Sequence, residues 1–202
     1  MRAATAAAHQ RLEDVMALDT DRLTRARYAA ALQVLHAMRA GWDPGLAALF
    51  GQPPGPHAQW LAQDLAALGV SSLPPLAMPA MDAAEGWGMR YVLEGSALGG
   101  RVLLRRAEWM GLSPDAGARY FAGEGAETGP RWKRFLQALD QAATPEAVPL
   151  IVQGARRSFE ALAEAAEARF ASARFHESLD ARQDLAAPLA AVEDAVMADP
   201  RL

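Results

Sequence analysis

The chain has 202 residues, a formal net charge of −4 and no cysteine, and 51% of its residues are hydrophobic. This length fits one domain or at most two small ones. The mild charge, with no basic run carrying interleaved aromatics, argues against nucleic-acid binding. The lack of cysteine excludes disulfides, thiolate zinc sites, iron–sulfur clusters and cysteine nucleophiles.

The sequence also predicts the compartment in which the protein works. No stretch approaches the roughly 18 uncharged apolar residues of a membrane span, so we expect no membrane anchor. The N-terminal alanine run is soon followed by Glu13 and Asp14. That pattern is typical of an amphipathic helix rather than a signal peptide, and we therefore expect a cytoplasmic location.

Alanine and leucine dominate the chain and alternating β-branched runs are absent, so the predicted fold class is all-α. In chain order, helices are expected over residues 4–16, 22–40, 43–51, 57–68, 80–110, a short stretch around 120–121, 130–142, 145–174 and 178–197. Proline and glycine separate them at GQPPGP (51–56), SSLPPLAMP (71–79) and GEGAETGP (123–130). Thr20 or Asp21 is predicted to cap the second helix.

Three glycines interrupt the helix predicted over 80–110, namely Gly95, Gly99 and Gly100. Each glycine within a helix costs about 1 kcal/mol relative to alanine, which this chain uses freely elsewhere. Positions i, i+4 and i+5 are expected to form one bare strip on the helix surface. Two interpretations are open: tight packing against another helix, which is the commoner case, or close approach of a flat ligand.

His9 lies on the first predicted helix, and Glu13 follows one helical turn later. The functional interpretation is a single axial ligand to a haem iron, with Glu13 accepting a hydrogen bond from the other ring nitrogen. An ordinary surface pair at i and i+4 is the alternative. The four histidines are scattered and no H-x-x-x-H pair occurs, so we expect no metal site built from several protein ligands.

Three stretches carry a resemblance to a known family: RAATAAAHQRLE (2–13), YVLEGSALGGRVL (91–103) and RYFAGEGAETGPRWKRFLQAL (119–139). Together and in this order they resemble the haem (heme) oxygenase family, more narrowly the bacterial branch found beside bacteriophytochromes. The resemblance implies a single-domain helical bundle over residues 1–174 with haem sandwiched between a proximal and a distal helix.

The resemblance also assigns roles to individual residues near the N-terminus. His9 matches the proximal ligand of the haem iron, and Glu13 matches the acidic residue that steadies it. Thr5 matches a threonine in the same block and joins the haem-binding set.

On the distal side, the resemblance implies a catalytic segment made of Gly95, Ser96, Gly99 and Gly100. Its glycines let the helix backbone lie against the haem face. Many family members carry aspartate where this chain has Ser96, whose hydroxyl forms hydrogen bonds but carries no charge. Proton delivery is therefore open between Ser96, a nearby arginine such as Arg90 or Arg101, and water held by backbone carbonyls.

Three further residues complete the implied haem-binding set. Lys133 falls near a basic residue that binds a haem propionate, and Phe159 falls where an aromatic side chain packs near the distal pocket. Arg101, just after the glycines, is assigned to the same set.

The implied activity is oxygen- and electron-dependent cleavage of haem to biliverdin, CO and iron, with haem as both substrate and cofactor. The chain shows no flavin or nicotinamide motif, so an external reductant such as ferredoxin is expected. The branch implies that a bacteriophytochrome receives the bilin. A basic patch of Arg101, Arg105, Arg106 and Arg131 is a candidate docking surface for an acidic electron donor, with a solvated face as the alternative.

A second function is kept open beside this one, a non-catalytic haem-binding or helical interaction protein on the same fold. Residues 175–202 lie outside the resemblance. They are expected to form a C-terminal helical extension that caps the core or mediates homodimerisation, or else a loosely held tail.

Overall fold

The computed structural model of the chain describes the backbone of residues 1–18 and 23–197 and the side chains of residues 1–18 and 23–172. Its helices are α1 (Arg2–Met16), α2 (Arg25–Phe50), α3 (His57–Ala67), α4 (Ala83–Trp109), α5 (Arg119–Ala122), the 3-10 turn η1 (Gly125–Glu127), α6 (Thr128–Ala142) and α7 (Ala147–Met197). The only strand-like pairing in this part of the chain is a pair of isolated bridges made by Ser113. The all-α prediction is confirmed.

The helix α2 begins later and runs further than the sequence predicts. Thr24 caps it, accepting a hydrogen bond from the backbone N–H of Arg27. The predicted caps Thr20 and Asp21 lie outside the described residues. The prediction of two separate helices over 22–40 and 43–51 was wrong, because α2 continues through Pro44.

Packing explains why α2 survives its proline. Pro44 lacks an N–H and its ring crowds the preceding turn, which costs an isolated helix about 3 kcal/mol. Here Met38, Trp42 and Leu46 around the proline are all buried in the main core. The Trp42 indole also donates a hydrogen bond to the carbonyl of Ala77. Burial of these large side chains offsets the local cost of the proline.

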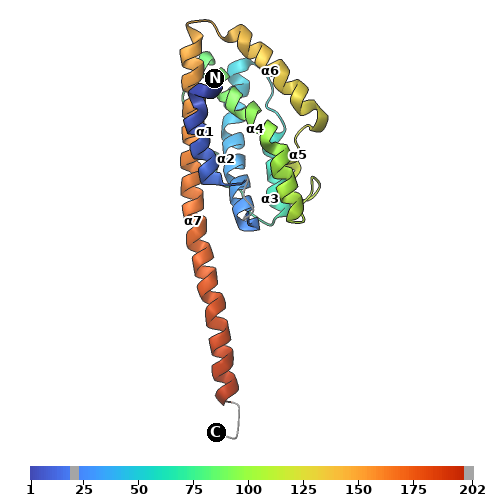
Figure 1. Cartoon of the computed structure of the whole chain (residues 1–202), viewed down its shortest axis with the longest axis vertical. Helices are drawn as coiled ribbons and strands as arrows, with labels where there is room; N and C mark the ends of the chain where they lie inside the picture. The colour runs from blue at the N-terminus through green and yellow to red at the C-terminus, as the bar shows by residue number, and fades with distance from the viewer. Residues whose placement is uncertain (19–22, 198–202) are drawn as a thin grey trace.

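The long helix α7 is the element against which α1 and α4 pack (Figure 1). Where α4 and α7 cross, Gly88 of α4 and Gly154 of α7 lie against backbone of the other helix. A Cβ at Gly88 would collide with the carbonyl of Ile151, and a Cβ at Gly154 would collide with that of Glu85. These two glycines therefore set a close crossing that holds α4 in place.

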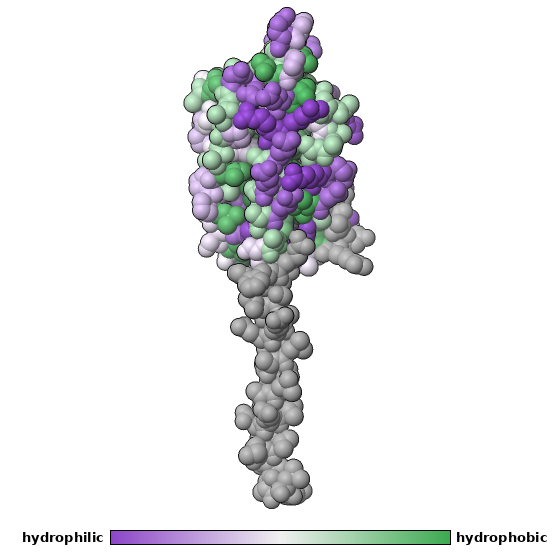
Figure 2. Space-filling model, turned by 90° about the vertical axis from the view of Figure 1, so that its left-hand side faces the viewer, coloured by the Kyte–Doolittle hydropathy of each residue, from purple (hydrophilic) through white to green (hydrophobic). Residues whose placement is uncertain are grey.

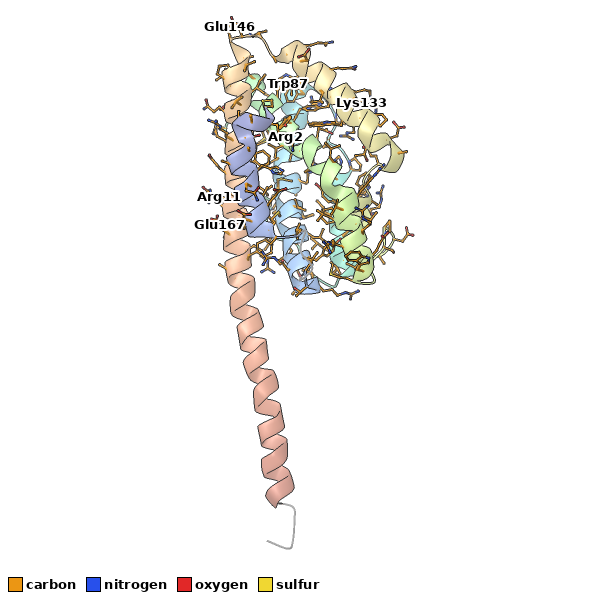
Figure 3. All side chains as sticks on the ribbon, in the orientation of Figure 1. Arg2, Arg11, Trp87, Lys133, Glu146 and Glu167 are labelled. Carbon is orange, nitrogen blue, oxygen red and sulfur yellow. The ribbon has the colours of Figure 1, made fainter. Side chains whose placement is uncertain are left out.

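The outward face of α7 is solvated. Figure 2 shows hydrophilic residues running down the middle of this face with apolar residues on both sides. Its exposed positions follow helical spacing and include Gln153, Arg156, Glu160, Glu164 and Glu167. Arg11 of α1 donates two hydrogen bonds to the Glu167 carboxylate, and Figure 3 shows the two side chains next to each other. An exposed pair of this kind adds at most about 1 kcal/mol.

Two other segments differ from the predictions. The expected glycine-rich loop over 123–130 contains η1, and α6 already begins at Thr128. The backbone of α7 continues to Met197, where a break after 174 was expected. The role of residues 175–202 stays a prediction. Within the described residues, none of the helices combines the length and apolar character that a membrane span requires.

Candidate functional site

His9 is placed by α1 on the surface of the bundle. Its side chain is 53% exposed, and its Nδ1 lies 3.4 Å from Oε2 of Glu13. The ring also meets the ring of Phe159 edge-on, with 5.3 Å between centroids. A histidine whose Nδ1 faces a carboxylate has its tautomer set, which leaves Nε2 as the nitrogen for a ligand.

Phe159 connects the helix that carries His9 with the helix that carries the glycines. It is buried on α7 in a cluster with Val92 of α4, and Ala8 and Leu12 of α1 pack against that cluster. Val92 precedes Gly95 by less than one helical turn. The predicted proximal and distal segments thus both pack against one small apolar cluster.

Thr5 is buried on α1, and its hydroxyl donates to backbone carbonyls within that helix, those of Met1 and Arg2. Arg101 and Lys133 are both exposed. Figure 3 shows Lys133 on α6, away from α1 in this view. The contacts predicted between these three residues and haem stay predictions.

The three glycines of α4 do not share one face, which corrects the expected strip. Gly99 has open space around it, since a Cβ there would meet no atom within 4 Å. A Cβ at Gly95 would lie 3.6 Å from the ring of Trp132. Gly100 is buried, and a Cβ there would come within 2.8 Å of the carbonyl oxygen of Phe121. Packing against α5 therefore accounts for Gly100, and the bare strip consists of Gly95 and Gly99.

Apolar side chains stand exposed beside this bare strip. Leu98 is 46% exposed and Val102 is 37% exposed, and both lie within one turn of Gly99. Exposed large apolar residues grouped around bare backbone form a surface that suits a flat apolar ligand. The exposed imidazole of His9, which contacts Phe159 of the cluster that includes Val92, adds one metal-binding nitrogen. These residues fit haem.

Behind α4, on the side of α2 and α3, the structure holds buried polar groups that the sequence analysis did not single out. Two cavities lie there, one of about 30 Å³ reaching Ser96 and Gly100 and one of about 100 Å³ reaching Asp43 and Arg90. Five residues line both cavities: Arg39, His57, Leu93, Glu94 and Arg131. The sequence held one signal for these buried groups, the spacing of Arg39 and Asp43 four residues apart on a mainly apolar helix.

Arg131 is engaged behind α4 and is not available for the predicted basic patch. Its guanidinium donates two parallel hydrogen bonds to Glu94, at 2.8 and 2.9 Å, and another to Glu124. Burial would raise the pKa of Glu94, but the hydrogen bonds and charge of Arg131 outweigh it, so this pKa lies below its ordinary value. Only Arg101, Arg105 and Arg106 remain of the patch, and Arg106 stacks on Trp109.

Among the described residues, no group of histidine, aspartate and glutamate side chains is arranged to hold a metal ion. A haem iron can be held by a single protein histidine, and His9 is the candidate for that role.

The model of the heme oxygenase family matches residues 77–168, which contain α4, α5, α6 and the first part of α7. A heme oxygenase of Xanthomonas campestris pv. campestris (strain 8004) is 35% identical over 125 residues, covering 56% of this chain and 72% of that protein. The chain belongs to the heme oxygenase family. Family membership supports heme oxygenase activity, the degradation of haem with oxygen and a reductant.

The fold of this heme oxygenase agrees with that of a solved relative. The crystal structures of the NO- and CO-bound heme oxygenase from Neisseria meningitidis match it with a TM-score of 0.66. The match has 22% sequence identity and covers 84% of this chain and 89% of that chain. At this identity the comparison establishes the shared all-α fold.

Outside the candidate haem site, His57 has a strongly lowered pKa. Burial, with the charges of Arg39 and Arg131, lowers the pKa of the imidazole from 6.5 to about 3, while Glu94 opposes the shift. The folded state keeps His57 neutral in a range where the unfolded chain takes up a proton. The stability from neutral His57 is therefore complete above about pH 6.5 and is lost progressively as the pH falls toward 3.

We expect the substitution His57→Gln to flatten the acid side of the stability profile. One proton taken up only on unfolding lowers the free energy of unfolding by at most about 1.4 kcal/mol per pH unit. Urea unfolding at several values between pH 6 and 4.5 measures this slope. The control Trp60→Phe alters the ring packed 5.2 Å from His57 but removes no titrating group. Equal slopes for wild type and His57→Gln would contradict the prediction.

Proposed function

We propose that this chain cleaves haem oxidatively to biliverdin, CO and iron, with His9 as the protein ligand of the iron. The observation that carries the proposal is the connection of His9, through Phe159 and Val92, to the bare and apolar surface of α4. Haem, when bound, supplies the iron at which oxygen is activated and the macrocycle that is cleaved.

The side chains on the proximal side are proposed to bind the haem iron and to orient its histidine ligand. His9 would coordinate through Nε2, and Glu13, whose Oε2 lies 3.4 Å from Nδ1, would accept a hydrogen bond from it that fixes the tautomer and raises the basicity of the ligand. Phe159 supports the ring of His9 from the core. Lys133 and Arg101 are the proposed partners of the haem propionates, because exposed cations attract exposed carboxylates.

The distal side brings backbone close to the reacting atoms and surrounds it with apolar side chains. Gly99 presents open helix backbone, and Gly95 one turn earlier lies beside the Trp132 ring, so main-chain groups around Gly99 are within reach of the bound substrate. Leu98 and Val102 cover the neighbouring surface with apolar atoms. Arg90, considered for proton delivery, lies over the rings of both Phe50 and Trp87, which favours water over this arginine as the proton carrier.

The partners of the reaction belong to the same proposal. The electron donor is an external reductant such as ferredoxin, which approaches the arginines in the C-terminal part of α4, the exposed Arg101 and Arg105 and the partly buried Arg106. The bilin product serves as chromophore for a bacteriophytochrome. Residues 175–202 are proposed as an extension for homodimerisation, and the protein is proposed to work in the cytoplasm.

The test uses purified protein loaded with haem, supplied with O₂ and ascorbate or reduced ferredoxin. Loss of the Soret band with growth of a biliverdin spectrum is the expected result. A haem complex that persists through many reduction cycles without forming bilin would overturn the enzyme proposal and favour the non-catalytic haem-binding protein. A chain that binds no haem would overturn both.

The substitution Ser96→Ala is expected to lower biliverdin formation by less than about tenfold. Ser96 donates its hydroxyl proton to the carbonyl of Leu93 at 2.8 Å, within its own helix, and a neutral hydrogen bond contributes only about 1 kcal/mol. The matched control is Ser158→Ala on α7, which removes a bond of the same kind to Gly154. A loss of turnover of about 100-fold in Ser96→Ala alone would instead assign proton delivery to this hydroxyl.

A further inference from the structure

The carbonyl of Leu93 receives two side-chain hydrogen bonds in addition to its place in the helix. Arg39 of α2 donates through Nη2 at 2.9 Å, and Ser96 donates through Oγ at 2.8 Å. Within α4, the same carbonyl faces the N–H of Ala97, one turn later. Leu93 precedes Gly95 by two residues, so these bonds converge where the bare strip begins.

Arg39 reaches this carbonyl from within the protein. It is buried, and its Nη1 pairs with Oδ1 of Asp43 at 3.2 Å. The Arg39 Nε and the Asp43 Oδ2 have no hydrogen-bond partner in the described part of the chain. Burying such an incompletely paired couple costs free energy that an apolar pair of the same size would not cost. Outside the couple, Arg39 donates to the Leu93 carbonyl and also interacts with the Tyr120 side chain.

A second tether holds the next residue from another helix. Glu94 accepts the two parallel hydrogen bonds of Arg131 from α6, and Trp132 of α6 lies against Gly95. The segment that leads into the glycines is thus held by α2 through a main-chain atom and by α6 through a side chain. Glycines give a helix little stiffness of its own, so its course here depends on such external contacts.

We propose that Arg39 is a positioning residue that sets the course of α4 at residues 93–100. It acts through the Leu93 carbonyl, and Asp43 orients its guanidinium. The inference rests on the proposed function, in which Gly95 and Gly99 face the substrate. Charge-assisted hydrogen bonds are shorter and stronger than neutral ones, which suits a contact that must hold a flexible segment within a fraction of an ångström.

The test removes the couple without leaving an unpaired charge behind. In the double variant Arg39→Met with Asp43→Leu, both charges go together, a replacement that is often neutral or stabilising. The variant Arg39→Lys keeps the charge beside Asp43 but lacks the fork that reaches two acceptors at once. The matched control is Arg25→Met, because Arg25 also lies on α2 and donates to the carbonyl of Met110, the C-cap residue of α4.

The first measurement is amide hydrogen exchange in the haem-free protein. In the double variant, amides of residues 94–100 are expected to exchange about tenfold faster than in wild type, while amides of α7 residues 158–166 keep their rates. Arg39→Lys is expected to fall between the two. Arg25→Met is expected to leave residues 94–100 unchanged. A uniform increase across α4 and α7 reports lost global stability and would overturn the local role, as would unchanged exchange at 94–100.

The second measurement is turnover after loading with haem. The double variant is expected to lower kcat by about tenfold or more with little change in haem affinity. A displaced α4 backbone slows the reaction of bound haem, whereas lost contacts with haem would weaken its binding. Equal loss in Arg25→Met would overturn the inference. Failure of the proposed function is distinguishable, because wild type would then form no biliverdin while the exchange pattern of the haem-free protein still reports on Arg39.

Discussion

His9→Ala is expected to lower biliverdin formation more than about 100-fold and to change the ferric haem spectrum. Loss of an outer partner of a metal ligand already costs about 10- to 100-fold, and loss of the ligand itself exceeds this. Stability is expected to stay near that of wild type, because the His9 side chain is 53% exposed. Haem titration followed by absorbance, together with single-turnover assays, measures both effects.

The control for this prediction is Gln10→Ala, which removes the exposed neighbour of His9 on the same helix. Free imidazole added to His9→Ala should fill the vacated ligand position and restore part of the spectrum and the turnover. A wild-type ferric spectrum in His9→Ala would show that another group binds the iron and would remove the basis of the proximal assignment.

Gly99→Leu is expected to lower biliverdin formation without lowering stability, whereas Gly100→Ala is expected to lower stability. Open space surrounds Gly99, and leucine is better than glycine in a helix by about 1 kcal/mol, so Gly99→Leu should unfold at the same or higher urea concentration. Its side chain would hold a flat substrate away from the backbone, and displacement by about 1 Å costs on the order of 100-fold in rate.

Gly100→Ala should show the reverse pattern. A Cβ at this position approaches the carbonyl oxygen of Phe121 to 2.8 Å, and overpacking of this kind costs about 1–3 kcal/mol. Urea unfolding measures the stability of both variants, and single-turnover biliverdin formation measures their activity, each relative to wild type. Wild-type turnover in Gly99→Leu would mean that this face of α4 does not meet haem.

Local patterns were sufficient for most of the helices because helix signals act over short distances. Alanine-rich periodic stretches, with breaks at Gly51 and around 71–79, placed α3 and α4 within a few residues of where the structure has them. The same reasoning failed at Pro44, where a local penalty is real but the buried Trp42 and Leu46 outweigh it. Burial of distant contacts is the kind of term that a local pattern does not contain.

The candidate site divides along the same line. Residues whose chemistry is visible in the sequence, His9 with Glu13 and the glycines of α4, could be proposed from type and spacing. Which glycine is bare and which is packed could not be predicted from the sequence, because Gly99 and Gly100 differ only in what lies beside them. Arg39 and its contact with Leu93 were also out of reach, since the donor and acceptor are 54 residues apart.

The sequence by itself determined the all-α fold class, and the resemblance of three stretches indicated the heme oxygenase family and singled out His9 and the glycines of α4 as candidates for haem binding. Residue type and helical spacing carry that much, because helix signals and the chemistry of a side chain are local properties. Only the tertiary structure decided that Gly100 serves packing, that Arg131 is tied to Glu94 and that Arg39 holds the Leu93 carbonyl. Each of these depends on the position of a second helix, and long-range packing alone sets that position.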